Sequence, residues 1–405
     1  MNNSRKAVQN LLSNMEKGGY SPIVLNLELE RGEYSTQDKA FITALFYGII
    51  ERLLTLDYII DKLVGDKKPE PIIRNLLRMG LYQIEFMESV PDSAAVNETV
   101  NLTPNRAKGY VNGVLRNFAR ARIRTGSGGS ATTKLDEVEA TNRNFTRNRG
   151  DFFNGELENN LSIKYSCPEW LVQKWHNEYG EANLLQILQT SLEKPPIFRH
   201  YVKKELSDSY VQDQSSYQAC ELLNPQSGEV VLDLCSAPGG KSFTIAKLMN
   251  NSGRVISCDI NAKKLRLVES GSKRLGLDII ETLLNDAKVF NPDFPKCDKV
   301  VCDVPCSGLG VIRRKPEIKY KPASDFDGLP TIQLKILQTS ASYVKSDGFL
   351  MYSTCTLSRS ENDDVIESFL SEPSIKQQFE LVQKKTTIPS TDGGDGFFVA
   401  ILKRK

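Results

Sequence analysis

The second half of the chain alternates strand and helix patterns around a glycine loop, and this alternation constrains the fold more than any other feature of the sequence. An apolar run at 230–234 leads into a loop that contains Gly239 and Gly240. Strand patterns follow at 254–258, 279–284, 299–304 and 349–353, and helical patterns lie at 241–249, 262–275, 331–344 and 361–370. This order predicts an α/β fold with a parallel, doubly wound sheet. Two last strand patterns, at 379–382 and 397–402, have no helix between them and predict an antiparallel hairpin at one edge.

The first half of the chain has a helical pattern instead. Apolar residues recur at helical spacing through residues 1–124, and Ser35 and Thr36 are candidate caps for a long periodic stretch at 40–63. The sequence TGSGGSATT and the polar residues after it predict a flexible linker. We therefore expect four segments, namely an all-α bundle at 1–124, a polar flexible linker at 125–160, a connecting subdomain at 161–228 and the α/β domain at 229–405.

Length, charge and cysteine usage exclude several classes of protein. With 405 residues, the chain should form two or three domains of roughly 150 residues each. A formal net charge of +2 requires any nucleic-acid surface to be a local patch. The chain has no apolar run of about 18 residues and no secretory pattern, so we expect a cytoplasmic protein with no membrane partner. Eight cysteines without a CxxC pair, beside only two histidines, predict reduced thiols and no metal site.

Two acidic residues follow the glycine loop at the ends of successive strand patterns. Asp259 ends the second strand pattern, where an acidic side chain accepts hydrogen bonds from ribose hydroxyls in folds of this type. Asp286 lies just beyond the third pattern, within reach of an adenine edge. The loop has neither GxGxxG nor GxxxxGK[ST] spacing, which favours a nucleoside without a pyrophosphate. The alternative is a tight structural turn, but two acids in register with strand ends favour a binding site.

Two cysteines lie just past strand ends, in loops that are rich in Pro, Ser, Thr and Gly. Asp303, Pro305 and Cys306 end the fourth strand pattern, and Cys355 ends the fifth. Neighbouring parallel strands would bring both thiols to the crevice where the cofactor binds. A free cysteine is also among the most buried residue types, so either thiol could belong to the core. The cysteines that we assign to the core are Cys167, Cys220, Cys258, Cys297 and Cys302, together with the thiol of Cys235, although the backbone of Cys235 borders the cofactor loop.

The segments LDLCSAPGGKS, DVPCSGLGVIRRKPEIKY and YSTCTLSRSEN resemble, in order, the three main motifs of the RNA cytosine-5 methyltransferases. The resemblance covers about 196–405 and implies a Rossmann-like methyltransferase domain that uses S-adenosyl-L-methionine. It also implies that Cys355 is the nucleophile, that Cys306 assists release of the adduct, and that Asp303 contacts cytosine N3. The cofactor-binding residues that follow from these patterns are Cys235, Ser236, Ala237, Pro238, Gly239, Gly240, Lys241, Asp259, Asp286 and Asp303.

The chemistry of the target carbon explains the need for a thiol. Carbon 5 of cytosine is too electron-poor to attack a methyl sulfonium, and addition of a thiolate at carbon 6 turns it into an enamine-like nucleophile. The thiolate must form near neutral pH from a group whose unperturbed pKa is about 8.5. A base must then remove the proton on carbon 5 so that the thiolate can leave. The target base also has to be unstacked to admit both reagents.

The helical half resembles the RNA-binding helical domain of the NusB type, in the segments DKAFITALFYGIIERLLTLDYIIDKL and AAVNETVNL…GYVNGVLRN. A NusB-like domain before this catalytic domain is the layout of the RsmB/Sun/Fmu family of bacterial 16S rRNA cytosine-5 methyltransferases. The resemblance implies a role in rRNA processing that makes 5-methylcytosine, with 16S rRNA as the partner, no DNA partner and a monomeric enzyme. Two departures are the long polar linker and PPIFRHYVKK, where His200 and Tyr201 replace the end of an Arg-x-Asn element.

Two basic clusters are candidates for contacts with RNA. Arg116, Arg120 and Arg124 are spaced to share one helical face, and Arg106, Lys108 and Arg122 are near them in sequence. The alternative for this cluster is an ordinary solvated face. The second cluster borders the active-site motif, which favours contacts with substrate phosphates, and consists of Arg313, Arg314, Lys315, Lys319 and Lys321.

Three other functions remain open at this point. A transfer RNA cytosine-5 methyltransferase would use the same chemistry, and only the helical domain favours ribosomal RNA. A non-catalytic RNA-binding assembly factor could retain the fold, although both thiols, Asp303 and the glycine loop argue against it. A Rossmann oxidoreductase is disfavoured by the missing GxGxxG loop and by the paired thiols.

Overall fold

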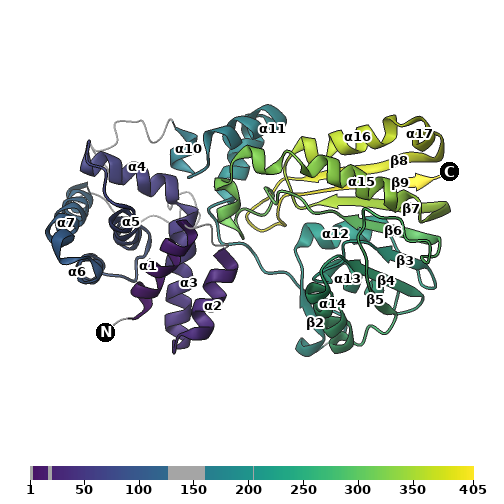
Figure 1. Cartoon of the computed structure of the whole chain (residues 1–405), viewed down its shortest axis with the longest axis horizontal. Coiled ribbons are helices and arrows are strands. Elements are labelled where there is room, and N and C mark those ends of the chain that lie inside the picture. The colour runs from purple at the N-terminus through teal and green to yellow at the C-terminus, as the bar shows by residue number, and fades with distance from the viewer. Residues whose placement is uncertain (1–2, 17–20, 126–159, 204) are drawn as a thin grey trace. The chain divides into compact units, whose positions relative to one another are not determined.

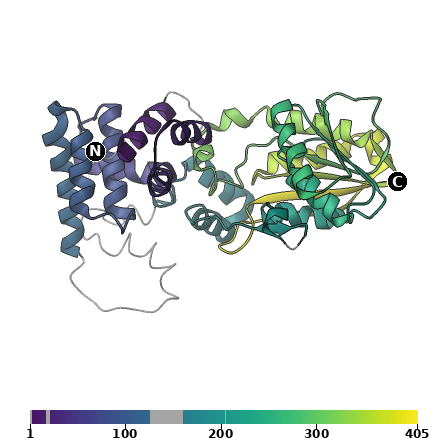
Figure 2. The ribbon, with the colours of Figure 1, turned by 90° about the horizontal axis from the view of Figure 1, so that it is seen from below.

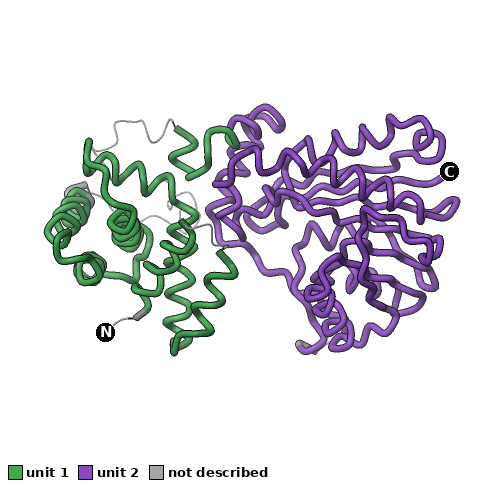
Figure 3. The backbone as a smooth tube through the Cα atoms, viewed as in Figure 1, with its two compact units in different colours: residues 1–172 green, residues 173–405 purple. Residues whose placement is uncertain are grey.

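The computed structural model describes residues 3–16, 21–125, 160–203 and 205–405. The chain divides into two compact units, Met1–Val172 and Gln173–Lys405, which we describe separately (Figure 3). Almost all of the expected linker at 125–160 lies outside the described residues.

The first unit is helical, as expected. In Figure 2 its blue helices lie side by side as a bundle in which α5, α6 and α7 pack against one another. Its helices are α1 (Asn3–Glu16), α2 (Ser21–Arg31), α3 (Thr36–Glu51), α4 (Leu53–Val64), α5 (Pro71–Phe86), α6 (Asp92–Leu102), the 3-10 turn η1 (Asn105–Ala107), α7 (Lys108–Thr125) and α10 (Leu161–Lys164). The long periodic stretch forms two helices, because the backbone leaves helical geometry at Arg52. Ser35 caps α3 as predicted, in a capping box with Asp38.

The first unit extends beyond the expected linker. The Thr55 hydroxyl donates to the carbonyl of Ile163 at 2.5 Å, and the Leu54 amide donates to the Ser166 hydroxyl at 2.9 Å. These bonds attach α10 and the turn after it to α4. Residues 161–172 therefore pack with the helices of the first unit, whereas the sequence placed them in the connecting subdomain.

The second unit is a seven-stranded sheet of order β5-β4-β3-β6-β7-β9-β8 with helices on both faces (Figure 1). Strands β3 to β7 pair in parallel, and β9 and β8 add the predicted antiparallel edge. A small antiparallel hairpin of β1 and β2, which the sequence did not predict, precedes the sheet. The strands are β1 (Arg199–Tyr201), β2 (Ser209–Val211), β3 (Val230–Asp233), β4 (Arg254–Asp259), β5 (Ile280–Leu284), β6 (Cys297–Asp303), β7 (Val344–Thr354), β8 (Phe379–Thr387) and β9 (Phe397–Arg404).

Helices cover the sheet in two layers, which Figure 1 shows on opposite sides of the strands. One layer buries apolar side chains of α15 and α16, and the other buries those of α12, α13 and α14. The helices of this unit are α11 (Glu169–Thr190, which begins in the first unit), α12 (Gln214–Leu223), α13 (Gly240–Leu248), α14 (Ala262–Leu275), α15 (Leu329–Ala341), α16 (Asp363–Ser371) and α17 (Pro373–Gln378), with 3-10 turns η2 (Leu206–Asp208), η3 (Pro316–Tyr320), η4 (Ala323–Phe326) and η5 (Arg359–Glu361). Within the described ranges, no helix is both long and apolar enough to cross a membrane.

The register of the two central strands positions the candidate site. Asp303 at the end of β6 pairs with Ser353 near the end of β7. The loops that carry Cys306 and Cys355 therefore leave the sheet at the same level, from neighbouring strands. This is the edge at which open α/β sheets bind their ligands.

Candidate active site

The loop between β3 and α13 needs glycine at its last turn. Gly239 has a φ of +116°, and a Cβ atom there would lie 2.5 Å from the Phe243 ring. The loop is fixed to the next strand, because the Ser236 amide donates to the carbonyl of Cys258 at 2.8 Å. The Ala237 amide also donates to the Asp259 carboxylate at 3.3 Å. The glycine loop and the first predicted acid thus form one structural unit.

A cavity of about 350 Å³ lies beside this loop, at the carboxyl ends of the strands. Five predicted cofactor residues line it, namely Cys235, Ala237, Asp259, Asp286 and Asp303. Five others do not line it, namely Ser236, Pro238, Gly239, Gly240 and Lys241. The lining residues that the sequence did not identify are Leu234, Ile260, Lys264, Ala287, Lys288, Pro305, Ile332 and Ile336. Carboxylates for ribose and apolar walls for a base fit the nucleoside part of S-adenosylmethionine.

Lys241 does not line the cofactor cavity, although its sequence motif placed it among the cofactor-binding residues. Its side chain is buried, and its Nζ lies 2.7 Å from Oδ2 of Asp303. The Ser353 hydroxyl donates to the other oxygen of Asp303, also at 2.7 Å. Burial alone would lower the pKa of Lys241, but the carboxylate of Asp303 outweighs it, so the pKa of Lys241 is raised. Asp303 is therefore held between a buried ammonium and a hydroxyl at the wall of the cavity.

The structure brings together the two cysteines that the sequence singled out. The Sγ atoms of Cys306 and Cys355 lie 3.3 Å apart, and both residues are partly exposed. A hydrogen bond from the Cys306 thiol lowers the pKa of Cys355 against the opposing effect of burial, and the same bond raises the pKa of Cys306. Of the two thiols, Cys355 is therefore the more readily ionised. The prediction that the other thiols belong to the core is confirmed for Cys167, Cys220, Cys258, Cys297 and Cys302, which are buried, while Cys235 lines the cavity.

A second glycine allows the cysteine loops to meet a third segment. The Gly310 amide donates to the carbonyl of Cys355 at 3.1 Å, and the Gly396 amide donates to the carbonyl of Gly310 at 2.9 Å. A Cβ atom on Gly310 would lie 2.2 Å from the carbonyl oxygen of Gly396. Only glycine allows this approach, which joins both cysteine loops to the loop between β8 and β9.

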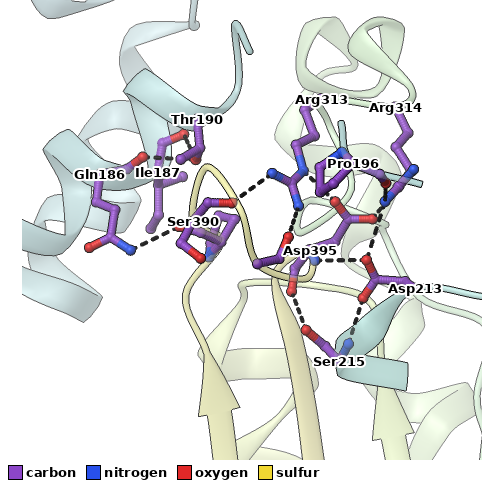
Figure 4. A network of polar contacts seen from close by, with 12 residues as sticks. Gln186, Ile187, Thr190, Pro196, Asp213, Ser215, Arg313, Arg314, Ser390 and Asp395 are labelled. Atoms are coloured by element: carbon purple, nitrogen blue, oxygen red, sulfur yellow. Dashed lines mark hydrogen bonds and ion pairs between the residues drawn. The ribbon is translucent and has the colours of Figure 1, made fainter. Parts of the chain in front are cut away.

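The basic cluster next to the cysteine loop is largely occupied within the protein. Figure 4 shows the side chains of Arg313 and Arg314 converging on Asp395. Arg313 Nε lies 2.5 Å from Oδ1 of Asp395, and Arg314 contacts Oδ2 of Asp395 and, at 3.3 Å, Asp213. The guanidinium of Arg313 also donates to the carbonyls of Ser390 and Gly393. The prediction that this cluster holds substrate phosphates is therefore wrong for Arg313, which is 3% exposed and fully paired.

Comparison with protein families gives two matches that together span most of the chain. Residues 220–403 match the family described as 16S rRNA methyltransferase RsmB/F, and residues 2–120 match the NusB family. The first match contains the cavity and both cysteine loops. The second match lies entirely in the helical unit.

Individual relatives and solved structures agree with these matches. The chain is 32% identical to the probable ribosomal RNA small subunit methyltransferase B of Bacillus subtilis, over 98% of each chain. It is 30% identical to the ribosomal RNA small subunit methyltransferase B of Proteus mirabilis, over 92% of each. The crystal structure of the protein PH0851 covers 99% of this chain and 98% of its own with a TM-score of 0.70, at 20% identity. That likeness shows the fold.

Proposed function

Since the chain belongs to the RsmB/F family of S-adenosylmethionine-dependent 16S rRNA methyltransferases, we propose that it methylates carbon 5 of a cytosine in 16S rRNA, with Cys355 as the nucleophile. The thiol pair of Cys306 and Cys355, with its sulfur atoms 3.3 Å apart, carries the proposal. Methyl transfer to a nitrogen or an oxygen atom does not need a thiol nucleophile. Carbon 5 of cytosine does, because it must be activated by addition at carbon 6.

Cys355 begins the reaction by adding its thiolate to carbon 6 of the unstacked base. The lowered pKa of Cys355, which the hydrogen bond from Cys306 causes, supports a reactive thiolate near neutral pH. Residues that line the cavity, Asp259 and Asp286 among them, would hold S-adenosylmethionine, which would supply the methyl group for carbon 5. Removal of the proton on carbon 5 then restores the double bond, and the bond between Sγ and carbon 6 breaks.

Addition of the thiolate places negative charge on the base, and we infer that the pair of Lys241 and Asp303 stabilises this charge. Negative charge develops at N3 as the thiolate adds, and a proton donor there stabilises the adduct. Asp303 lies at the cavity wall next to Pro305, and the buried ammonium of Lys241 lies 2.7 Å from it. We infer that Asp303 faces N3 and that the buried ammonium of Lys241, which keeps its proton because its pKa is raised, offsets through Asp303 the negative charge that develops on the base.

Cys306 takes part in the release of the product. Before addition, the thiol of Cys306 donates a hydrogen bond to Sγ of Cys355. This hydrogen bond is lost once Cys355 is bound to carbon 6. Cys306 must then release its own proton to solvent, and its thiolate accepts the proton of carbon 5, so that the 5,6 double bond reforms and Cys355 departs as a thiolate. The tight spacing of the two sulfur atoms supports this division of roles.

The helical unit supports the choice of ribosomal RNA. Arg116 and Arg120 are exposed on α7, one helical turn apart, and Arg106 is exposed but paired with Glu70. Side chains of Arg122 and Arg124 lie outside the described residues. We propose that the exposed face of α7 binds the phosphate backbone of the substrate.

The first prediction tests both chemistry and substrate. Labelled S-adenosylmethionine is offered with unmodified 16S rRNA and, separately, with transfer RNA, and the modified base is mapped. We expect 5-methylcytosine at one position of 16S rRNA, and we expect Cys355→Ala to abolish labelling while cofactor binding stays within about twofold. Cys297→Ala, which removes a buried core thiol, is the matched control. Labelling of transfer RNA alone would contradict 16S rRNA as the substrate, and methylation by Cys355→Ala would contradict Cys355 as the nucleophile. Cofactor binding without labelling of either RNA would point to a partly assembled ribosomal subunit as the substrate or to a non-catalytic assembly factor.

A further inference from the structure

A buried carboxylate lies between the two cysteine loops. Glu361, in η5, is 1% exposed. It accepts hydrogen bonds from the amide of Ser307 at 2.9 Å, from the hydroxyl of Ser307 at 2.6 Å and from Nε2 of Gln333 at 2.9 Å. All of these donors are neutral. Burying an ionised carboxylate without a cation costs stability, so such a group is expected where its charge or geometry serves another purpose.

The hydroxyl groups near Glu361 belong to the residues that directly follow the two cysteines. Ser307 follows Cys306, and Thr356 follows Cys355. The hydroxyls of Ser307 and Thr356 are hydrogen-bonded at 2.6 Å, and the Thr356 hydroxyl lies 3.5 Å from Glu361 Oε1. One carboxylate and two hydroxyls therefore fix the backbone next to each sulfur atom.

The same carboxylate also reaches the cofactor side of the site. Gln333 donates from Nε2 both to Glu361 and to the carbonyl of Pro305, the latter at 3.0 Å. In α15, Gln333 lies beside Ile332, and Ile332 and Pro305 both line the cofactor cavity. The backbone carbonyl of Glu361 in turn accepts from the hydroxyl of Tyr352 at 2.5 Å. Glu361 thus connects the cavity wall, the loop after β6 and the loop after β7.

We propose that Glu361 is a positioning residue for the two-cysteine reaction, which sets the distance between Cys306 and Cys355 and keeps the proton of the pair on Cys306. This inference rests on the proposed function and names a further residue that it requires. The hydrogen bond to Cys355 and burial are the main causes of the raised pKa of Cys306, and the negative charge of Glu361 adds to them. A proton held on Cys306 leaves the thiolate on Cys355.

The test measures the reactivity of Cys355 without RNA, in the full-length protein. The rate of its alkylation by iodoacetamide is followed by mass spectrometry of the labelled peptide between pH 5.5 and 9. Glu361→Gln removes the charge and faces an amide toward the donors of Ser307 and Gln333. We expect the pH profile of Cys355 alkylation in this variant to move to higher pH. We also expect kcat for RNA methylation to fall about 100-fold with KM nearly unchanged, because misplacement of reacting groups slows the chemical step.

Three variants keep the result specific. Glu361→Asp keeps the charge and should return the alkylation profile toward that of the wild type. Thr356→Val removes one hydroxyl from the network at nearly constant volume, and it should show the same direction of change if Glu361→Gln does not fold. Glu367→Gln, on the exposed side of α16, is the matched control and should change neither readout.

The outcome separates this inference from the proposed function. Folded Glu361→Gln with a wild-type alkylation profile and a wild-type kcat would overturn the positioning role. If the wild-type protein methylates no RNA, the proposed function fails, yet the alkylation profiles of the variants still decide whether Glu361 controls the thiol pair.

Discussion

The two basic clusters of the molecule look alike in the sequence and differ in the structure. On α7 of the helical unit, Arg116 and Arg120 are exposed, and among the described residues no carboxylate lies within ion-pair distance of either. Next to the cysteine loop, Arg313 and Arg314 are bound to Asp395 and Asp213. The first cluster offers charge to solvent and to phosphates. The second cluster uses its charge to hold loops of the catalytic unit together.

A run of like charges therefore predicts a binding surface only when the carboxylates that pair with those charges are also known. Asp213 and Asp395 lie about 100 and 80 positions from Arg314 in the sequence, so no local pattern reveals the pairing. The pairing has a structural use. Asp395 is in the loop between β8 and β9, whose Gly396 contacts Gly310 in the cysteine loop, and the ion pairs hold this approach in place (Figure 4).

The largest effect is expected from breaking the buried pairs. Asp395→Asn removes the charge between two guanidinium groups, one of which is buried, and leaves both without their main carboxylate partner. We expect the free energy of unfolding of the catalytic unit to fall by about 3–5 kcal/mol, as it does when one partner of a buried ion pair is removed. Urea unfolding measures this decrease. Asp392→Asn, at an exposed position of the same loop, should change stability by less than about 0.5 kcal/mol. Equal stability of the two variants would mean that the arginines are not structural.

A different effect is expected from the exposed cluster. Arg116→Ala combined with Arg120→Ala should leave the unfolding free energy within about 0.5 kcal/mol of the wild type. If both side chains neutralise phosphates, the slope of log affinity against log salt should become shallower by about 1.4–1.8, because each neutralised phosphate adds about 0.7–0.9 to the slope. Binding of 16S rRNA fragments at several salt concentrations measures the slope. Lys39→Ala, an exposed cation on α3, serves as control, and an unchanged slope in the double variant would make α7 an ordinary solvated face.

The fold class and the family could be predicted from the sequence because their signals are local. Each site motif is a short run at the end of a strand, and parallel neighbours bring such ends together whatever the rest of the chain does. The Rossmann-like domain, the NusB-like bundle and the antiparallel edge of β8 and β9 are confirmed. The pairing of Cys306 with Cys355 followed from the same rule, because β6 and β7 are neighbours.

What the sequence left undetermined depends on contacts between distant segments. No proline or glycine at Arg52 indicates in the sequence that α3 ends there and that α4 is a separate helix. Lys241 looked like the end of a cofactor loop, but the side chain turns inward because Asp303 on another strand compensates its buried charge. Glu361 lies inside the motif YSTCTLSRSEN, but the sequence did not indicate its role, because that role depends on Ser307 and Gln333, which no spacing rule connects to it.

The smallest expected effect concerns Lys315, which, like Lys321, is an exposed member of the second cluster. Lys315 is exposed, and among the described residues no carboxylate pairs with it. The pKa of Cys355 is lowered mainly by the hydrogen bond from Cys306, with smaller contributions from Lys241 and then Lys315. Lys315→Ala should therefore raise the pKa of Cys355 slightly.

The direction of this pKa shift determines how the alkylation rate of Cys355 changes with pH. A higher pKa leaves less thiolate on the acid side, so alkylation of Cys355 should slow by about twofold below pH 7 and match the wild type at high pH, where the thiolate is complete. Because an exposed charge acts across solvent, about 1 M salt should remove most of the difference. Lys321→Ala, which changes the exposed lysine at the other end of η3, is the control for a general decrease in charge. A shift that persists in high salt would show that Lys315 acts by direct contact, and no shift would show that Lys315 does not influence the pKa of Cys355.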